Sequence, residues 1–265
     1  AGCPGGDGQR LASCGVSPLV SVVIPAFNAA AFLRTAIASC LRQTLTDLEV
    51  LVVDDGSADA TVAVAQEFTT DERVRVLELG TNQGVSAARN AALDAARGTW
   101  IATLDADDWM TDDRLEVLVS AAEAAGADMA HDDELLVHEG STEPFGTLSG
   151  VTGAEVRTVV PVDLARLVDC EIGGSSPYRL GLTQPIIRRA FLEEHHLRYD
   201  TSLRVGEDHL LYLELLLAGA TWIQIPTAHY VYVQRRASAT SSAQVPTIES
   251  KLRVCDAVRA RPGLT

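Results

Sequence analysis

The sequence predicts an α/β protein with a doubly wound, mostly parallel sheet and helices on both of its faces. In the first 110 residues, short apolar runs rich in β-branched residues alternate with helical patterns, and the connections between them are short. This order of elements is typical of parallel sheets with right-handed crossovers. Two of the predicted strands end directly in paired acids, which favours a ligand site at the carboxyl edge of the sheet.

The first half of the chain alternates strands and helices. The run 20–25 is rich in β-branched residues and ends at Pro25, as expected of a buried strand. The segment 29–43 has apolar residues at helical spacing, which predicts an amphipathic helix against the sheet. By the same criteria, we expect strands over 48–53, 74–79 and 100–104, and helices over 59–68 and 85–97.

The second half has fewer regular patterns. The sequence predicts a helix over 111–126, a strand over 128–137, a polar loop over 139–153, a short helix over 162–168, a loop over 172–181, a short apolar run over 185–189 that leads into 190–196, an apolar helix over 210–218, and two closing strands over 222–226 and 228–233. In this interpretation, residues 1–17 are a flexible tail and 18–235 form one domain with two halves, 18–110 and 111–235. A mobile loop and a C-terminal helix follow over 236–265.

The composition excludes several classes of protein. The formal net charge of −15 and the sequence pI near 4.7 argue against a nucleic-acid-binding protein, which needs a basic surface. No apolar run reaches the ~20 residues of a membrane-spanning helix, so we expect no membrane span. The five cysteines are scattered without metal-binding spacing, which favours reduced thiols in a cytoplasmic protein. Peripheral association with the inner face of a membrane stays open.

The stretch 103–109 is the one around which the chain is organised. An apolar run ends there in Asp105, Asp107 and Asp108. Carboxylates at positions i and i+2 can hold a hard cation such as Mg²⁺ or Mn²⁺, which often completes its shell with phosphate oxygens of a substrate. An acidic protein that binds an anionic nucleotide needs such a cation or local basic residues. The alternative interpretation is a solvated acidic turn that caps the following helix.

Five motifs occur in an order that resembles a known family. They are VSVVIPAFN at 20–28, VVDDGS at 52–57, NQGVSAARN at 82–90, LDADD at 104–108 and GED at 206–208. Together they resemble the inverting glycosyltransferases of family 2, of the type that builds bacterial polysaccharides and cell-surface glycans. The resemblance covers about residues 20–233. It implies a GT-A fold with a nucleotide-sugar half over 18–110 and an acceptor half over 111–235.

The resemblance also implies a reaction and roles for single residues. A hexose or N-acetylhexosamine would move from a nucleotide diphosphate sugar, commonly a UDP sugar, to a hydroxyl of a glycan, lipid-linked or small-molecule acceptor. Asp208, next to Glu207, corresponds to the general base, and Asp107 corresponds to a ligand of a Mn²⁺ or Mg²⁺ ion. The residues that correspond to donor binding are Pro25, Ala26, Phe27, Asn28, Asp54, Asp55, Gly84, Arg89, Asp105 and Ala106.

Several assignments have two interpretations. His229 is either a further metal ligand or a structural residue of a strand, and Trp109 is either the floor of an acceptor pocket or a packing residue. Asp108 lies either beside the metal or at the start of the following helix. Glu207 competes with Asp208 as the base, and acids at these positions are also favoured by the dipole of the helix that follows.

Two other functions share some of these features. A sugar-1-phosphate nucleotidyltransferase also uses a doubly wound sheet and acids on Mg²⁺. It normally carries a Gly-rich basic loop after the first strand, whereas this chain has Pro-Ala-Phe-Asn at 25–28. A non-catalytic module that binds nucleotide sugars would not need a base, whereas this chain keeps both acids at 207–208.

Overall fold

The computed structural model describes residues 17–170, 178, 180, 183–235 and 255–256. Except for a few residues, the expected tail over 1–17, the loop over 172–181 and the C-terminal segment 236–265 lie outside this part of the chain.

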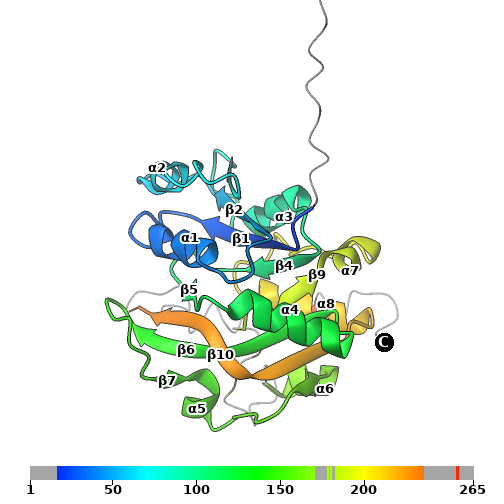
Figure 1. The fold of residues 1–265 in the computed structure, drawn as a ribbon. Coiled ribbons are helices and arrows are strands. Elements are labelled where there is room, and N and C mark those ends of the chain that lie inside the picture. The colour runs from blue at the N-terminus through cyan, green and yellow to red at the C-terminus, as the bar shows by residue number, and fades with distance from the viewer. Residues whose placement is uncertain (1–16, 171–177, 179, 181–182, 236–254, 257–265) are drawn as a thin grey trace, which may run out of the picture.

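One mixed sheet organises the fold (Figure 1). Its strands follow the order β3-β2-β1-β4-β9-β6-β10-β5, with β7 beside β6 and β8 beside β10. The strands are β1 (Val20–Ala26), β2 (Leu48–Asp54), β3 (Val74–Glu78), β4 (Trp100–Thr103), β5 (Trp109–Met110), β6 (Met129–His138), β7 (Gly146–Thr147), β8 (Val160–Val162), β9 (Ile186–Arg188) and β10 (Trp222–Gln234). As predicted, the first four are parallel. Beyond them β9 runs antiparallel to both β4 and β6, whereas β6 and β10 are parallel.

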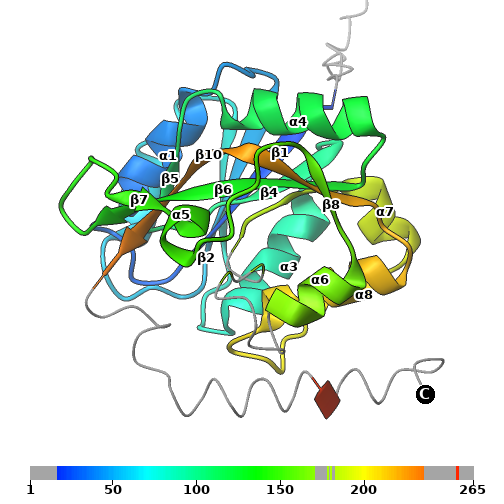
Figure 2. The same cartoon turned by 90° about the horizontal axis from the view of Figure 1, so that it is seen from below.

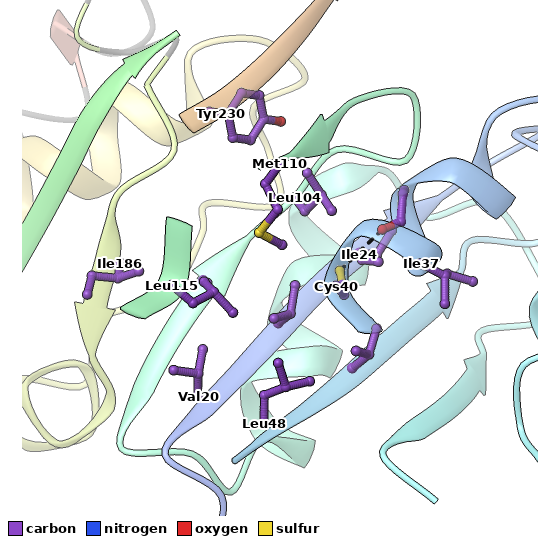
Figure 3. Close-up of a cluster of buried hydrophobic side chains, with 14 of the residues drawn as sticks. Val20, Ile24, Ile37, Cys40, Leu48, Leu104, Met110, Leu115, Ile186 and Tyr230 are labelled. Atoms are coloured by element: carbon purple, nitrogen blue, oxygen red, sulfur yellow. Dashed lines mark hydrogen bonds between the residues drawn. The ribbon is translucent and has the colours of Figure 1, made fainter. Parts of the chain in front are cut away.

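Helices cover both faces of the sheet (Figure 2). They are α1 (Leu33–Leu41), α2 (Thr61–Gln66), α3 (Val85–Ala95), α4 (Arg114–Ala125), α5 (Leu148–Thr152), α6 (Leu164–Val168), α7 (Arg189–Glu194) and α8 (Glu207–Leu217). On one face, α1 and α4 pack around Val20 and Ile24, in the cluster drawn in Figure 3. On the other face, α3, α6 and α8 pack around Val23 and Leu51. Because successive residues of a strand point to opposite faces, β1 and β2 contribute to both clusters and are buried along their whole length.

The closing strand β10 differs from the prediction. The sequence predicts a break at Pro226, because proline cannot donate to the ladder. In the structure one strand continues through it, with two register shifts against β6 between residues 224 and 230. Asp132 of β6 accepts hydrogen bonds from the backbone N–H groups of His229 and Tyr230, at 2.9 Å each. A side chain thus replaces the ladder partners that the irregular strand lacks.

Other elements match the prediction in type but differ in extent. The helices expected over 29–43 and 111–126 begin later, at α1 and α4, and the helix expected over 210–218 begins earlier, at α8. The segment 139–153, expected as a loop, also contains β7 and α5. Within the described residues, no helix combines the length and the apolarity needed to cross a membrane.

A buried carboxylate ties three strands together at the amino ends of the sheet. Glu49 of β2 is 2% exposed and accepts hydrogen bonds from Ser21 Oγ of β1 (2.8 Å) and Arg75 Nη1 of β3 (3.0 Å). Arg97, after α3, donates to it from its backbone N–H and from Nη2, at 2.7 Å each. Burial opposes ionisation, but the bonds from Arg97 and Ser21 outweigh it, so the pKa of Glu49 is lowered.

We expect Glu49→Gln to reduce the free energy of unfolding by about 1.5–3 kcal/mol, the range for hydrogen bonds to a charged group. Because the folded-state pKa of Glu49 lies below its ordinary value, this stability is present above that value and is lost as the pH falls through the folded-state pKa. Urea unfolding should therefore separate variant and wild type at neutral pH and much less in acid. Glu78→Gln, at the exposed end of β3, is the control. Equal stability of Glu49→Gln and wild type at neutral pH would contradict the prediction.

Candidate active site

Acidic residues from two strands border the carboxyl edge of the sheet. β2 ends at Asp54 and β4 leads into the segment 105–108, with β1 between the two strands. The register pairs Ala26 with Asp54, and the N–H of Leu104 donates to the carbonyl of Val23 (2.9 Å). Neighbouring strands lie about 4.8 Å apart, so the ends of β2 and β4 are roughly 10 Å from each other. Both acidic groups therefore border one strip of this edge.

Asp54 holds a tight turn and keeps one oxygen without a partner. Its Oδ2 accepts hydrogen bonds from the N–H groups of Gly56 and Ser57, at 3.1 Å each. Its Oδ1 is buried and has no hydrogen-bond partner in the described part of the chain. Since a buried acceptor without a partner costs free energy, this oxygen suits an N–H donor of a ligand.

Asp55 supports the neighbouring loop. Its two oxygens accept hydrogen bonds from the N–H groups of Gln83 (2.7 Å) and Gly84 (2.8 Å), just before α3. Gly56 lies against the same loop: its φ is +75°, and a Cβ there would come within 2.6 Å of the carbonyl carbon of Thr81. Only glycine fits this approach. Asp55 and Gly84, expected as donor-binding residues, thus bind each other and fix the start of α3.

Arg89 joins acids from distant parts of the chain. Its Nη1 donates to Glu207 Oε1 (3.0 Å) and Asp208 Oδ1 (2.8 Å), and its Nη2 donates to Asp105 Oδ1 (3.1 Å). The guanidinium also lies over the ring of Tyr199, 5.1 Å from its centroid. Arg89 is only 2% exposed. Because these partners enclose the guanidinium, Arg89 binds acids of the protein and does not present a free surface to a nucleotide.

The acids around Arg89 carry more negative charge than one guanidinium can offset. Burial raises the pKa of Asp208 to about 8, and Glu207 and Asp105 add to this increase, whereas Arg89 opposes it. A carboxylate with a raised pKa is a stronger base than an ordinary aspartate. The side chain of Asp208 is 14% exposed and that of Glu207 is 9% exposed. The greater exposure of Asp208 therefore favours it over Glu207 as the group that meets an acceptor.

Asp108 is anchored to β10 rather than to the following helix. Its Oδ2 accepts a hydrogen bond from Tyr230 Oη and its Oδ1 accepts one from the N–H of Val233, at 2.8 Å each. Tyr230 Oη in turn accepts a hydrogen bond from the N–H of Asp105 (3.2 Å). Burial, followed by the charges of Asp105 and Asp107, raises the pKa of Asp108 well above its ordinary value. Asp108 and Tyr230 thus fix the shape of the segment 105–108.

Asp107 faces a cationic side chain. Arg235, the first residue after β10, forms an ion pair with Asp107 and lies over the ring of Phe32, 4.7 Å from its centroid. Burial, followed by the charge of Asp105, raises the pKa of Asp107. The position of Asp107 therefore favours a positive charge beside it.

His229 contacts the residues just before α4. Its Nδ1 is 2.9 Å from Thr111 Oγ1 and 3.0 Å from Asp113 Oδ1, and its backbone is bound to Asp132. Within the described residues these contacts join His229 to the start of α4 and not to Asp107, in keeping with the structural interpretation. The register shifts of β10 turn Tyr230 toward the acids instead.

The acidic segment suits a hard divalent cation. The side chains of Asp105 and Asp107 are 34% and 25% exposed, so both carboxylates reach solvent. Among the side chains that the structure describes, no group of three or more His, Cys, Asp and Glu residues is arranged to hold a metal ion alone. Two partly exposed carboxylates fit a hard cation that takes its remaining ligands from water and from a bound phosphate.

The loop after β1 offers one exposed aromatic ring. Phe27 is 48% exposed, whereas Pro25 and Ala26 are buried at the end of β1. The N–H of Asn28 donates to Ser57 Oγ, and its Oδ1 accepts a hydrogen bond from the N–H of Ala58, at 2.9 Å each. These two bonds join the loop to the turn at 57–58. Phe27 and Asn28 are therefore the expected donor-binding residues of this loop that are open to a ligand.

Two further residues take part in hydrophobic packing. Ala106 is 7% exposed and belongs to the core cluster on the α1 face. Trp109 is partly buried against Val137, Val231 and Val233, a contact that matches its packing interpretation.

Sequence reasoning missed Tyr230 and Gln184. Gln184 Nε2 donates to Asp105 Oδ2 (3.3 Å), and its backbone carbonyl accepts a hydrogen bond from the buried Arg114 (2.5 Å). Arg114 also pairs with Asp132, the residue that supports the irregular part of β10. No local motif marks either residue, because each reaches the acids through long-range pairing.

Comparisons with known proteins identify the family. Residues 21–142 match the model of glycosyl transferase family 2. The succinoglycan biosynthesis protein ExoO of Rhizobium meliloti is 36% identical over 248 residues, which cover 93% of this chain and 70% of ExoO. The chain belongs to glycosyl transferase family 2. ExoU of the same organism is 34% identical over 244 residues, covering 91% of this chain and 68% of ExoU. The predicted family is confirmed.

Solved structures of another protein share the fold. TarS of S. aureus, residues 1–349 in complex with UDP-GlcNAc, superimposes with a TM-score of 0.72 at 23% identity, over 92% of this chain and 67% of that one. The same fragment in complex with UDP gives a TM-score of 0.65 over 81% of this chain and 60% of that one. The mixed, mostly parallel sheet is therefore a GT-A-like fold, as predicted.

Proposed function

We propose that this glycosyltransferase moves a sugar from a uridine diphosphate sugar to an acceptor hydroxyl, with inversion at the anomeric carbon. The observation that carries the proposal is the cluster around Arg89, in which Asp208 lies beside Asp105 at the carboxyl edge of the sheet. Membership of the family gives the reaction class. The donor, the ion and the roles of single residues are proposed in addition.

The proposal that the donor nucleotide is UDP rests on Asp54 and on the likeness to TarS, whose crystal structures contain UDP and UDP-GlcNAc. The unpaired Oδ1 of Asp54 is an acceptor for the N3–H of uracil. The exposed ring of Phe27 lies at the end of the adjacent strand, where it can stack on the base. The sugar is a hexose or an N-acetylhexosamine in this proposal.

A divalent cation, Mg²⁺ or Mn²⁺, is held by Asp107, with Asp105 beside it. When bound, such an ion stabilises the negative charge that develops on a diphosphate leaving group. Burial raises the pKa of Asp107 and the charge of Asp105 adds to this increase, so a bound cation would find two neighbouring carboxylates to offset its charge.

Asp208 acts as the general base in this proposal. It takes the proton of the acceptor hydroxyl while the acceptor oxygen forms a bond to the anomeric carbon and the bond from that carbon to the diphosphate breaks. Attack from the side opposite the leaving group inverts the anomeric configuration. Arg89 positions Asp208 and Asp105 relative to each other through its two nitrogens.

The acceptor is a hydroxyl of a glycan, of a lipid-linked intermediate or of a small molecule. The names of the two Rhizobium relatives favour an exopolysaccharide. The chain spans about 70% of the length of these relatives, so the acceptor site of a longer protein can include further residues.

Release of UDP from a panel of UDP sugars, with Mn²⁺ or with EDTA, tests the proposed function. We expect release that depends on the cation and on Asp208, and NMR of the product should show an inverted anomeric centre. A sugar-1-phosphate nucleotidyltransferase would instead release pyrophosphate from UTP and a sugar phosphate. A binding module would bind UDP sugars without turnover. Retention of configuration, or equal rates in EDTA, would contradict the corresponding part of the proposal.

Asp54→Asn tests the donor assignment. The amide can keep its oxygen on the turn, but it then turns an NH₂ group toward the base, where two donors would face each other. We expect UDP affinity to fall by about tenfold or more, as for a lost buried hydrogen bond. Isothermal titration with UDP measures the loss, and Glu67→Gln, at an exposed side chain directly after α2, is the control. A folded Asp54→Asn variant with the UDP affinity of the wild type would disprove the role of Asp54.

A further inference from the structure

Arg235 occupies the place at Asp107 where the proposed cation would bind. It follows the last residue of β10, and its Nη2 forms an ion pair with Asp107 Oδ2. Its guanidinium also lies over Phe32, the residue just before α1, 4.7 Å from the ring centroid. Three segments that are far apart in sequence therefore meet at this one side chain.

We propose that Arg235 is a built-in counter-ion that competes with the divalent cation for Asp107 and that releases Asp107 when a nucleoside diphosphate binds. This inference rests on the proposed function, because it assumes a donor diphosphate at the same edge of the sheet. Its consequence is that the cation binds weakly to the free protein and tightly to the complex with the nucleotide.

The competition follows from the charges. A guanidinium and a divalent cation on the same carboxylate repel each other, and the repulsion is strong where water is partly excluded. The side chains of Arg235 and Asp107 are 27% and 25% exposed, so their pair is only partly screened by solvent. An ion that arrives alone must therefore displace Arg235, which then loses its carboxylate partner.

The geometry also explains why a diphosphate relieves this competition. The planar fork of an arginine binds phosphate oxygens as well as it binds a carboxylate. Arg235 Nε is buried and has no hydrogen-bond partner among the described residues, so donor capacity is left on the same side chain. Contact with the Phe32 ring holds the guanidinium near the edge after it leaves Asp107. The diphosphate thus offers Arg235 a new anionic partner at the moment when the cation takes Asp107.

Coupling of this kind is reciprocal. If UDP increases the affinity for the cation, the cation increases the affinity for UDP by the same factor. The Arg235 contact predicts that part of this coupling comes from the protein itself, in addition to the direct attraction between the ion and the diphosphate.

Binding of Mn²⁺ to the full chain, followed by the EPR signal of the free ion, tests the inference without any turnover. In the absence of nucleotide, we expect Arg235→Gln to bind Mn²⁺ about three- to tenfold more tightly than the wild type, because the competitor is removed. Saturating UDP should tighten Mn²⁺ binding in both proteins, but by a smaller factor in Arg235→Gln. Arg235→Lys keeps the charge and should bind Mn²⁺ as weakly as the wild type without UDP.

Arg34→Gln is the matched control. Arg34 also pairs with an acid, Glu67, and also lies over a phenylalanine, Phe68, 5.6 Å from its ring centroid, but it is outside the acidic segment. Mn²⁺ binding should not change in this variant. Far-UV circular dichroism of each variant checks that the fold is kept.

Two outcomes would overturn the inference. One is Mn²⁺ binding by folded Arg235→Gln, without UDP, that is equal to or weaker than that of the wild type. The other is an equal effect of UDP in both proteins. A wild type that fails to bind UDP would instead contradict the proposed function, while the nucleotide-free comparison of Arg235→Gln with wild type would still decide whether Arg235 competes for the ion.

Discussion

We expect the Asp208→Asn variant to transfer sugar about 10²–10⁴ times more slowly than the wild type, while its affinity for UDP stays nearly unchanged. The amide is close to isosteric with the carboxylate and can still accept a hydrogen bond from Arg89, but it cannot take a proton from the acceptor. Rates of UDP release and titration with UDP separate the two effects. Asp94→Asn, on a side chain that is 68% exposed and pairs with Arg198, is the control.

The pH dependence of the rate gives the same test a second readout. The base must be ionised to act, so the rate falls as the pH drops below the pKa of Asp208. Because burial and the neighbouring acids raise that pKa, the acid limb should lie well above the ordinary aspartate value, toward the neutral range. Asp208→Asn should remove this limb. If Glu207→Gln removes it while Asp208→Asn keeps it, Glu207 is the base and the present assignment is wrong.

Removal of Arg89 has the largest expected effect on stability. Arg89→Met leaves Asp105, Glu207 and Asp208 without the guanidinium that joins them, and the loss of one partner of a buried ion pair typically costs about 3–5 kcal/mol. Urea unfolding at neutral pH measures this loss. Arg34→Met, at a side chain that is 56% exposed, should change the free energy of unfolding by less than about 1 kcal/mol.

The sign of the pH effect distinguishes this explanation from a simple packing defect. Without Arg89, the acids hold their protons more strongly in the folded state than in the unfolded state, so the loss of stability is greatest at high pH and shrinks as the pH falls. Arg89→Lys keeps the positive charge but loses the planar guanidinium with its several donors. Its free energy of unfolding should lie between those of the wild type and Arg89→Met. A loss in Arg89→Met that is the same at every pH would show that charge is not its cause.

The parallel half of the sheet could be predicted because local sequence determines it. The apolar runs of β1 and β2 are buried on both faces, and such runs are recognisable without knowledge of their neighbours. The acids after β2 and β4 could be placed at one edge because parallel strands end on the same side. The roles of Asp55 and Asp108 were not predictable in this way, because both carboxylates bind backbone groups of other segments.

The second half was harder to predict for a physical reason. Two register shifts in β10 break the simple alternation of its side chains, so counting along the strand cannot tell that Tyr230 faces the acids and His229 faces α4. Gln184 gave no signal, since its contact with Asp105 depends on the antiparallel placement of β9. Pairing over such distances is determined by the whole sheet and leaves no local trace.

The shortness of β9 has a consequence for how such an enzyme can change. Backbone pairing between the four parallel strands and the β6–β10 pair passes through Ile186–Arg188 alone in the described sheet order. Because only three residues join the two groups of strands, an insertion or exchange in one group should disturb the backbone hydrogen bonds of the other group little. A chimera joined at β9 would still have to keep the side-chain contacts that cross between the two sides, such as Arg89 with Asp208 and Asp108 with Tyr230.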